Sequence, residues 1–291
     1  MNKSRRSSFI LHRSSLLFAL LLFSCREAPP ATTHDDLGRP LSLPRTITRV
    51  VSLAPNLTEV AYAIGAGGKV VGADDFSNYP AEARGLPKVG GMQPNIEKIV
   101  ALKPDLVIAS TEGNHPNLAP ALSAAGIPLF VVRTDRLAEI PAAMRRLGQI
   151  LGAEQTEERV RAVERAIAAQ RRVRVDGPRV LFAVWTDPLY VAGRNTFTDD
   201  LFALTGARNA VTVSGWPQYS LESLVAAPPD IILYPRGALT PQQVEALLAR
   251  APGVRSRVVS VNEDIFQRPG PRMAEAAAAL NAILDGHGGK R

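Results

Sequence analysis

The sequence has few of the residues that build metal and catalytic sites. It contains one cysteine and four histidines in 291 residues, and outside the leading segment and the polar stretch after it only His115 and His287 remain. A metal site of several histidines is therefore not expected. The GAGGK run at 65–69 follows an expected helix and lacks a Ser or Thr after the lysine, so it predicts a turn rather than a phosphate-binding loop. Because the Gly-x-Ser-x-Gly nucleophile elbow is also missing, we expect no enzyme activity.

The excess of positive over negative charge in the chain is also small. The net charge is +7, but Lys3, Arg5, Arg6 and Arg13 lie in a segment without acids, and the chain from residue 25 onward carries only +3. This charge is too mild and too evenly spread to favour a nucleic-acid partner. With 46% hydrophobic and 21% charged residues, the composition is typical of a globular protein of one large or two medium domains.

Long apolar runs are absent except for Leu16–Phe23, and eight residues are too few to span a bilayer. Residues 1–24 have the order of a secretory signal, with a basic start, the apolar run and the small Ser24. Leu-Phe-Ser-Cys resembles a bacterial lipoprotein signal, so we expect Cys25 to be lipidated and to become the N-terminus. The alternative is a plain secreted protein with an odd thiol. The prolines, threonines and acids of 25–47 predict a tether that builds no core.

One phrase occurs twice in the chain, as IEKIVALKPDLVIAS at Ile96–Ser110 and as LESLVAAPPDIILYP at Leu221–Pro235. Both copies have an acid at the second position, Val-Ala at the fifth and sixth, Pro-Asp at the ninth and tenth, and then an apolar run. Around each copy, expected strands alternate with expected helices. We therefore predict an α/β fold of two Rossmann-like lobes, 48–150 and 177–285, each with a largely parallel sheet.

A helix is expected to join the lobes, because residues 151–176 place apolar side chains at helical spacing between charged ones. A helix of about 20 residues is about 30 Å long, and such a spacer would allow only small closure of the lobes. Near the start of the first lobe, Asn56 and Glu59 have the spacing of a capping box and predict a helix N-terminus there.

Two lobes with a stiff link leave one cleft, and ligand sites in α/β sheets lie beyond the carboxyl ends of the strands. Aromatic residues make up only 5% of the chain, yet they gather in the loops expected at those ends. This gathering favours a ligand that is flat and partly apolar. The alternative is that each ring only seals its loop onto the sheet. The loop residues concerned include Phe76, Tyr79, Trp185, Tyr190, Trp216 and Tyr219.

Glu97 and Glu222 occupy matching places in the two copies of the phrase. Each follows a plausible N-cap, so one interpretation is that they only favour the helix dipole. The other is that they lie symmetrically, one on each lobe, and contact equivalent basic residues of a partner with twofold symmetry.

Several segments resemble, in order, those of the periplasmic substrate-binding proteins of ABC importers with a helical interlobe spacer, the vitamin B12 and iron-siderophore carriers. They are RVVSLAPNLTE, DFSNYP, NIEKIVALKPDLVIAS, SGWPQYSLESL and NEDIFQRPGPR. The resemblance implies a monomeric periplasmic lipoprotein that holds cobalamin between its lobes and delivers it to a homodimeric ABC permease with ATPase subunits. It assigns docking on permease arginines to Glu97 and Glu222.

For the ligand, the resemblance implies aromatic contacts from Phe76 or Tyr79, Tyr190 and Trp216, and polar contacts from Asp264 and Arg268. The sequence departs from this pattern at Gly91-Met92 and at Ser110, where the B12 carriers have tryptophans.

Two alternatives stay open. A ferric-siderophore or haem carrier would differ only in ligand, and Tyr79, Tyr219 or His115 could then meet a haem iron. A tetrapyrrole metal chelatase also uses two α/β lobes, and His115 with Glu112 is the only His-acid pair that could deliver the metal. The export signal disfavours the chelatase.

Overall fold

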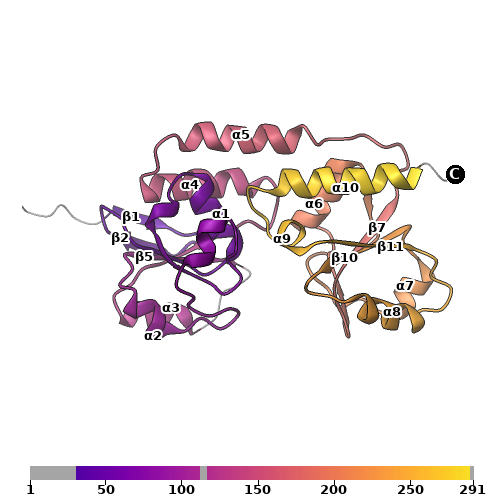
Figure 1. Cartoon of the computed structure of the whole chain (residues 1–291), viewed down its shortest axis with the longest axis horizontal. Helices are drawn as coiled ribbons and strands as arrows, with labels where there is room; N and C mark the ends of the chain where they lie inside the picture. Colours follow the sequence, from indigo (N-terminus) through magenta and orange to yellow (C-terminus); the bar gives the residue numbers. More distant parts are fainter. Residues whose placement is uncertain (1–30, 112–116, 289–291) are drawn as a thin grey trace, which may run out of the picture.

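The computed structural model describes residues 31–111 and 117–288 and shows two α/β lobes along the long axis of the molecule (Figure 1). The first lobe has a parallel sheet in the order β4-β3-β5-β6. The second has the order β11-β10-β7-β8, with β9 also paired to β7 and only β8 antiparallel. This confirms the predicted fold class. The strands are β3 (Val50–Ser52), β4 (Val70–Ala73), β5 (Leu106–Ser110), β6 (Leu129–Val132), β7 (Arg179–Thr186), β8 (Leu189–Val191), β9 (Arg208–Asn209), β10 (Ile231–Arg236) and β11 (Arg257–Asn262).

The duplicated phrase forms the same helix-strand unit in each lobe. Helix α2 (Ile96–Ala101) leads into β5, and α7 (Leu221–Ala226) leads into β10. The repeated Pro-Asp has the same task in both units. The carboxylate of Asp105 accepts the backbone N–H of Arg49 at 2.9 Å, just before β3, and that of Asp230 accepts the backbone N–H of Arg179 at 2.7 Å, at the start of β7. Each repeat thus ties its strand to the first strand of its own lobe.

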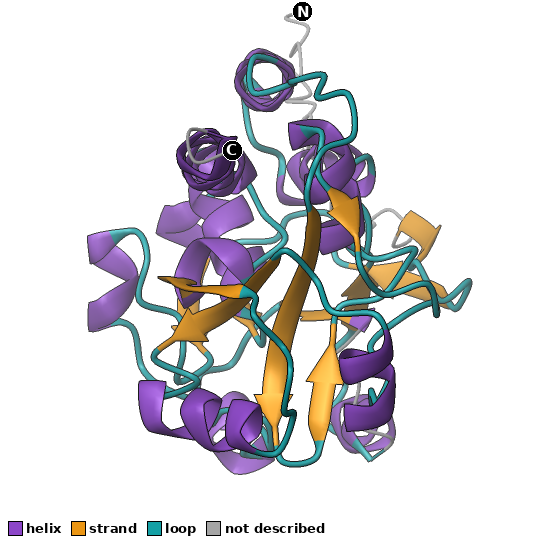
Figure 2. Ribbon diagram, turned by 90° about the vertical axis from the view of Figure 1, so that its right-hand side faces the viewer, coloured by secondary structure: helices purple, strands orange, loops and turns teal. Residues whose placement is uncertain are grey.

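The helices divide into two groups, because one face of each sheet packs on a hydrophobic core common to both lobes and the other face packs on a cluster within its own lobe. The lower helices in Figure 1 belong to single lobes, whereas the upper ones meet at the junction of the lobes. Figure 2 shows helices on both faces of the sheets. The lower group comprises α2, α3 (Leu118–Ala124), α7 and α8 (Pro241–Ala249). The upper group comprises α1 (Pro55–Ala63), α4 (Glu139–Leu151), α5 (Thr156–Ala168), α6 (Phe197–Thr205), α9 (Glu263–Phe266) and α10 (Met273–Gly288).

A single hydrophobic core runs under the upper helices from one lobe into the other. It joins Leu57 and Phe130 of the first lobe, Val160 of α5, and Phe182 and Phe266 of the second lobe, all at most 1% exposed. Each lobe has a separate cluster on the other face of its sheet. Because the shared core is continuous, the lobes are held together by buried packing as well as by their covalent link.

The predicted spacer helix over 151–176 is longer than the helix observed. Helix α4 ends at Gly152, which has left-handed φ and ψ of 59° and 41°, and α5 spans only Thr156–Ala168. A helix of 13 residues covers about 20 Å rather than 30 Å. Residues 169–178, named here the interlobe linker, then run without helix to β7. The sequence of the linker has apolar residues at helical spacing, but the linker is not helical. Hydrogen bonds from Arg174 to Asn281 and Asp285 of the second lobe hold it in another conformation.

The expectation of a structureless tether over 25–47 is wrong for its second half. Strands β1 (Ala31–His34) and β2 (Pro40–Leu43) form an antiparallel hairpin, and Leu43 and Ile47 are buried in the shared core. The turn of the hairpin is closed by Asp35, whose carboxylate accepts the backbone N–H groups of Leu37 and Arg39 at 3.0 and 2.9 Å. Two 3-10 turns, η1 (Gly67–Lys69) and η2 (Ala81–Gly85), complete the elements, and η1 confirms the turn predicted at 65–69. Within the described ranges no helix has the length and apolar character of a membrane span.

The capping box predicted from Asn56 and Glu59 does not form. Helix α1 begins one residue earlier, at Pro55, after an extended Ala54 that makes no side-chain cap. Proline suits a first helical position because the helix needs no N–H from it there. Asn56 and Glu59 are buried instead, and their side chains reach the opposite lobe.

We expect the protein to unfold in one cooperative transition because the shared core spans both lobes. Phe130→Ala, within that core, should lower the free energy of unfolding by about 3–5 kcal/mol and shift the whole transition. Differential scanning calorimetry measures both effects. Met92→Ala, at a side chain that is 72% exposed, is the control and should leave the transition in place. Two resolved transitions for Phe130→Ala would contradict a continuous core.

Candidate functional site: the interlobe cleft

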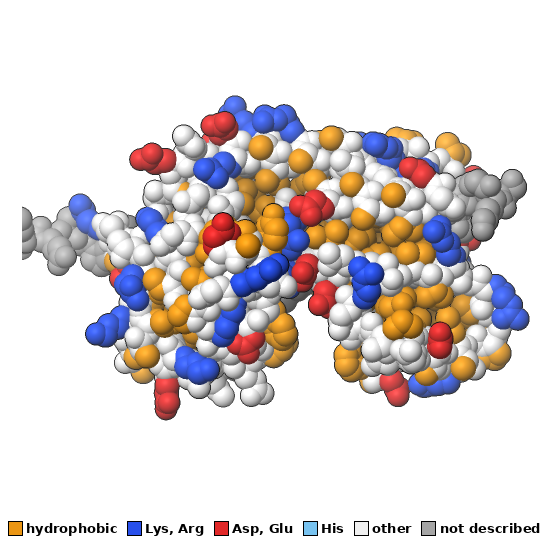
Figure 3. Space-filling model, in the orientation of Figure 1, with side chains coloured by type: hydrophobic (Ala, Val, Ile, Leu, Met, Phe, Trp, Pro, Cys, Tyr) orange, Lys and Arg blue, Asp and Glu red, His pale blue; other side chains and the backbone are white. Residues whose placement is uncertain are grey.

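A notch separates the two lobes on the side of α2 and α7, and hydrophobic side chains lie on both of its margins (Figure 3). A cavity of about 400 Å³ lies on the second-lobe side of the junction and is lined by Val184, Phe197, Trp216 and Gln267. These residues come from β7, α6 and the loops before α7 and after α9. The cavity therefore lies where strands end and loops begin, as expected for a ligand site in this fold class.

Three aromatic side chains are presented by the second lobe. Trp185 and Tyr190 are cross-strand partners in the β7–β8 hairpin and are 47% and 38% exposed. Directly opposed residues in an antiparallel pair point to the same face, so the two rings form one surface. Trp216 packs on Phe197 with ring centroids 5.5 Å apart, and its segment is joined to β8 by the Val191 N–H, which donates to the Pro217 carbonyl at 3.1 Å. The hairpin thus fixes this wall.

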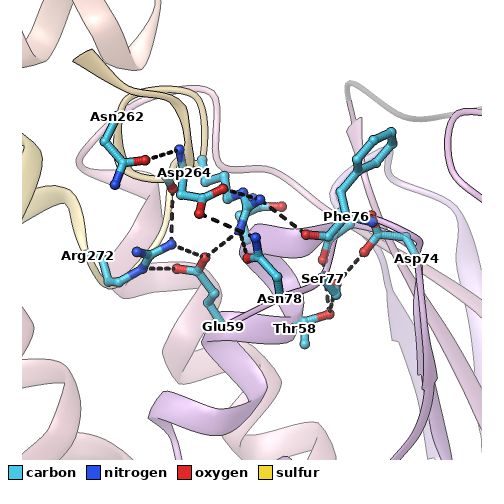
Figure 4. Close-up of polar contacts among 12 residues, drawn as sticks. Thr58, Glu59, Asp74, Phe76, Ser77, Asn78, Asn262, Asp264 and Arg272 are labelled. Carbon is cyan, nitrogen blue, oxygen red and sulfur yellow. Dashed lines mark hydrogen bonds and ion pairs between the residues drawn. The ribbon is translucent and has the colours of Figure 1, made fainter. Parts of the chain in front are cut away.

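Phe76 is the exposed aromatic residue of the first-lobe wall, at 54%. Its loop is held by Asp74, which accepts the Phe76 N–H at 3.0 Å and a hydrogen bond from Ser77 (Figure 4). Burial raises the pKa of Asp74, against the effect of these hydrogen bonds. The ring lies over Gly91, where a Cβ atom would be 2.9 Å from Phe76 Cε2. The glycine therefore permits the position of Phe76.

Five residues form an interlobe network at the junction: Glu59, Asn78, Asp264, Arg268 and Arg272 (Figure 4). Arg272 binds the Glu59 carboxylate through two hydrogen bonds of 2.8 and 2.6 Å. Arg268 donates to Asn78 at 2.7 Å and to the Phe76 carbonyl at 3.1 Å, and it is ion-paired with Asp264 at 2.5 Å. The network thus connects α1 and the Phe76 loop of the first lobe to the segment after β11 of the second lobe.

Burial dominates the electrostatics of the interlobe network. The side chain of Glu59 is 2% exposed, and those of Arg268 and Arg272 are 10% and 11% exposed. Burial raises the pKa of Glu59, while its hydrogen bonds and charge interaction with Arg272 and its proximity to Arg268 oppose the shift. A buried carboxylate of this kind needs its cations to remain in place.

Two further contacts cross the junction. Asn56 donates to Thr134 at 3.0 Å and to the Pro269 carbonyl at 3.2 Å. Arg136, before α4, donates to Asp200 of α6 at 2.8 Å, and the same carboxylate accepts the Leu137 N–H at 3.0 Å. The second lobe is therefore hydrogen-bonded to the first lobe at α1, through Asn56, and just before α4, through Arg136.

The structure gathers most of the predicted ligand residues but separates Tyr79 from them. Arg268 contacts both Asp264 and the Phe76 carbonyl. In the second lobe, Trp216 lines the cavity at the junction and Tyr190 is half-exposed on the β7–β8 hairpin. The Tyr79 ring instead lies 4.1 Å from the guanidinium of Arg272. It lines a different cavity of about 400 Å³, whose other lining residues are Glu59, Tyr62, Ala63, Pro80, Glu82, Pro271 and Arg272. Of the two alternatives Phe76 and Tyr79, the geometry favours Phe76 as the aromatic contact.

Glu97 and Glu222 occupy equivalent, exposed positions in the first turns of α2 and α7. Their helices are capped by Asn95, which accepts the Lys98 N–H at 2.9 Å, and by Ser220, which accepts the Ser223 N–H at 3.1 Å. Hydrogen bonds from its own backbone N–H and from Ser220 hold the pKa of Glu222 below the ordinary value. Both helices lie on the lower side of the molecule, the side on which the notch opens (Figure 1).

Sequence reasoning missed the contribution of Asn56, Glu59, Asn78 and Arg272. Pro55 in the sequence could have indicated this, because proline favours the first position of a helix. A helix that begins at Pro55 places Asn56 and Glu59 inside the helix, where neither can cap it. The spacing of Arg268 and Arg272 in RPGPR was a second signal, but nothing in the sequence alone indicates that both arginines reach one carboxylate. Cys25, Glu112 and His115 lie outside the described residues.

Residues 50–256 match the periplasmic binding protein family, and the chain belongs to that family. Its members are solute-binding proteins and not enzymes, so the expectation of no catalytic activity is confirmed. The chain has the substrate-binding role of an ABC importer.

The relatives include vitamin B12-binding proteins and haem-binding proteins. The vitamin B12-binding protein of Photorhabdus laumondii is 32% identical over 286 residues, which are 96% of this chain and 99% of the relative. The periplasmic haem-binding protein from Roseiflexus sp. RS-1, solved in apo form, has a TM-score of 0.74 at 30% identity over 83% of this chain and 99% of its own. The periplasmic vitamin B12-binding protein of Vibrio cholerae has a TM-score of 0.69 at 28% identity over 84% and 99%.

Arg272→Gln should destabilise the protein by about 3–5 kcal/mol at neutral pH because it leaves the buried Glu59 with less cationic partner charge. A raised folded-state pKa favours folding at low pH, and the substitution raises the pKa of Glu59 further. The loss of stability should therefore shrink as the pH falls toward 4.5, the ordinary pKa of the carboxyl. Urea unfolding at several pH values measures this dependence.

The matched control is Arg145→Gln, at an exposed arginine that is paired with Glu157 and Glu164. This variant should unfold as the wild type does, because exposed ion pairs contribute little. An equal loss in both variants would show that burial of the interlobe network has no special effect.

Proposed function

We propose that this protein captures a corrinoid, cobalamin, in the interlobe cleft and delivers it to an ABC permease. The observation that carries the proposal is the match to a vitamin B12-binding protein over 96% of the chain. The geometry is compatible with a large, flat ligand, since Phe76 is exposed on one wall and Trp185 and Tyr190 on the other. Asp264 and Arg268 would supply polar contacts from the edge of the interlobe network.

A haem carrier is the second candidate, because haem-binding relatives match the fold at TM-scores of 0.74 and 0.72. The two candidates share the cleft and differ in ligand. Tyr219, one of the tyrosines proposed for an iron, packs against the core cluster of the second lobe, and Tyr79 is stacked on Arg272. A visible absorption band after purification distinguishes the two, since haem and corrinoid spectra differ.

Delivery would use the symmetry of the duplicated phrase. Glu97 and Glu222 would contact equivalent arginines of a homodimeric permease that works with ATPase subunits, and the carrier would act as a monomer. Exposed ion pairs of this type favour encounter and orientation more than affinity. We further propose that residues 1–24 are removed on export and that Cys25 carries the lipid anchor in the periplasm.

Trp216→Ala should weaken cyanocobalamin binding by roughly tenfold to a hundredfold, because it removes an aromatic surface at the centre of the site. The chain has two tryptophans, so Trp185 still reports binding through its fluorescence. Trp185→Phe keeps a ring at the other position and should alter the affinity by less than about threefold. If the wild type shows no saturable change at micromolar ligand, the corrinoid proposal fails.

Glu97→Ala combined with Glu222→Ala should leave ligand affinity unchanged and reduce transport into cells or vesicles that contain the permease. The cause is the loss of both docking charges, one on each lobe. Glu154→Ala with Glu245→Ala removes the same charge from other exposed positions and should transport normally. A fall in ligand affinity in the first double variant would assign the two acids to the site or the fold instead of docking.

A further inference from the structure

The interlobe linker, residues 169–178, exposes apolar side chains and buries a charged one. Val173 and Val175 are each 91% exposed, the largest exposures among the large hydrophobic side chains of the described residues. Arg174, between them, is 17% exposed. Arg174 therefore points inward, whereas the valines on either side of it point to solvent.

This arrangement is held in place by the second lobe. The Arg174 guanidinium donates to Asn281 at 3.0 Å, to Asp285 at 2.6 Å and to the Thr205 carbonyl. The Arg172 N–H donates to the Leu204 carbonyl at 3.0 Å. The linker is thus fixed against α6 and α10, and the exposure of the valines is a property of the fold.

The charge around the two valines is positive. Arg165 in the last turns of α5, Arg171 and Arg172 are exposed, and no carboxylate of the described chain is ion-paired with them. The guanidinium of Arg172 donates to the carbonyls of Ala169 and Arg171, at 3.1 and 2.9 Å. The acids close by in the chain are Glu164, which is paired with Arg145, and Asp176, and Asp285 of α10 is paired with Arg174.

We propose that Arg165, Arg171, Arg172, Val173 and Val175 form a docking surface for a membrane rich in anionic phospholipid. Phosphate headgroups would meet the three arginines, and the two valines would enter the interface between headgroups and acyl chains. We name these five residues the linker patch. A lipid surface has anionic headgroups for the arginines and an apolar interior for the valines. The combination of both kinds of side chain therefore points to a membrane.

The location of the linker patch suits this partner. It lies on the α5 side of the molecule, opposite α2 and α7, so a membrane bound there does not cover the cleft or the proposed docking acids (Figure 1). Docking on the permease would then follow release from this surface. If Cys25 carries a lipid, as proposed above, the six residues to Ala31 span at most about 20 Å. The anchor would therefore keep the body next to the bilayer, with the hairpin and the interlobe linker at opposite ends of the long axis (Figure 1). The patch itself does not require the anchor or the ligand.

The test uses residues 26–291, which contain every described element of the fold, and lipid vesicles in co-sedimentation. The protein should bind vesicles in which a third of the lipid is phosphatidylglycerol, and not vesicles of phosphatidylcholine alone, and added salt should weaken binding. Arg165→Gln with Arg171→Gln and Arg172→Gln should lower the partition coefficient roughly a hundredfold. Val173→Ser with Val175→Ser should lower it roughly tenfold.

A matched control removes the same charge elsewhere, through Arg45→Gln, Arg194→Gln and Arg236→Gln at exposed arginines. It should retain most of the binding. Equal losses in the two triple variants would show attraction by net charge only and would overturn the proposal, as would a wild type that does not distinguish the two vesicle types. Cyanocobalamin binding is measured in parallel, so a failure of the patch is separate from a failure of the corrinoid proposal.

Contact with the acyl region is tested directly, because residues 26–291 contain no cysteine. Val173→Cys, labelled with a polarity-sensitive dye, should show a blue shift with the anionic vesicles. Val213→Cys, at a valine that is 55% exposed outside the linker, should not. A blue shift at Val173 without vesicles, together with a dimer in sedimentation velocity, would assign the linker patch to a second copy of the chain and overturn the membrane proposal.

Discussion

The buried carboxylate of Glu59 is the contact on which the geometry of the cleft depends. It comes from the first helix of one lobe and is held by two arginines that follow the last strand of the other. Packing in the shared core brings the lobes together, but apolar contact is tolerant of small shifts. Paired hydrogen bonds between a carboxylate and a guanidinium are not, because they require both distance and direction. The core thus supplies adhesion, and the interlobe network fixes the register of one lobe against the other.

The interlobe network also bears on the two walls of the cleft, because it contacts the loop that carries the first wall. On one side a hairpin carries Trp185 and Tyr190, and on the other a hydrogen-bonded turn carries Phe76. Arg268 joins the two sides, since it contacts Asp264 in its own lobe and the Phe76 carbonyl in the other. A ligand in the cleft therefore meets surfaces whose separation is already set, which lowers the entropy that it must lose on binding.

The sequence was sufficient for the parts of the fold that repeat or alternate. The two copies of the helix-strand phrase and the parallel sheets followed from hydrophobic periodicity and from the repeat. It was insufficient where a side chain acts over a long range. Asn56 and Glu59 have a local pattern that favours a cap, yet contacts more than 200 residues away determine their positions. Likewise the linker has helical spacing, but Arg174 is bound to α10. A local sequence pattern cannot reveal such distant partners. For the same reason the sequence could not show that Tyr79 contacts Arg272 while Phe76 is exposed.

The short helices α2 and α7 have a consequence for how the carrier is recognised. Each follows a side-chain cap and leads directly into a central strand of its own sheet, so the spacing between Glu97 and Glu222 is set by the scaffold and not by the contents of the cleft. Substitutions in the lining, such as at Gly91, would alter cargo without moving these two positions. A permease that senses only this spacing would accept related carriers with different cargoes, and discrimination would then fall to the translocation pathway.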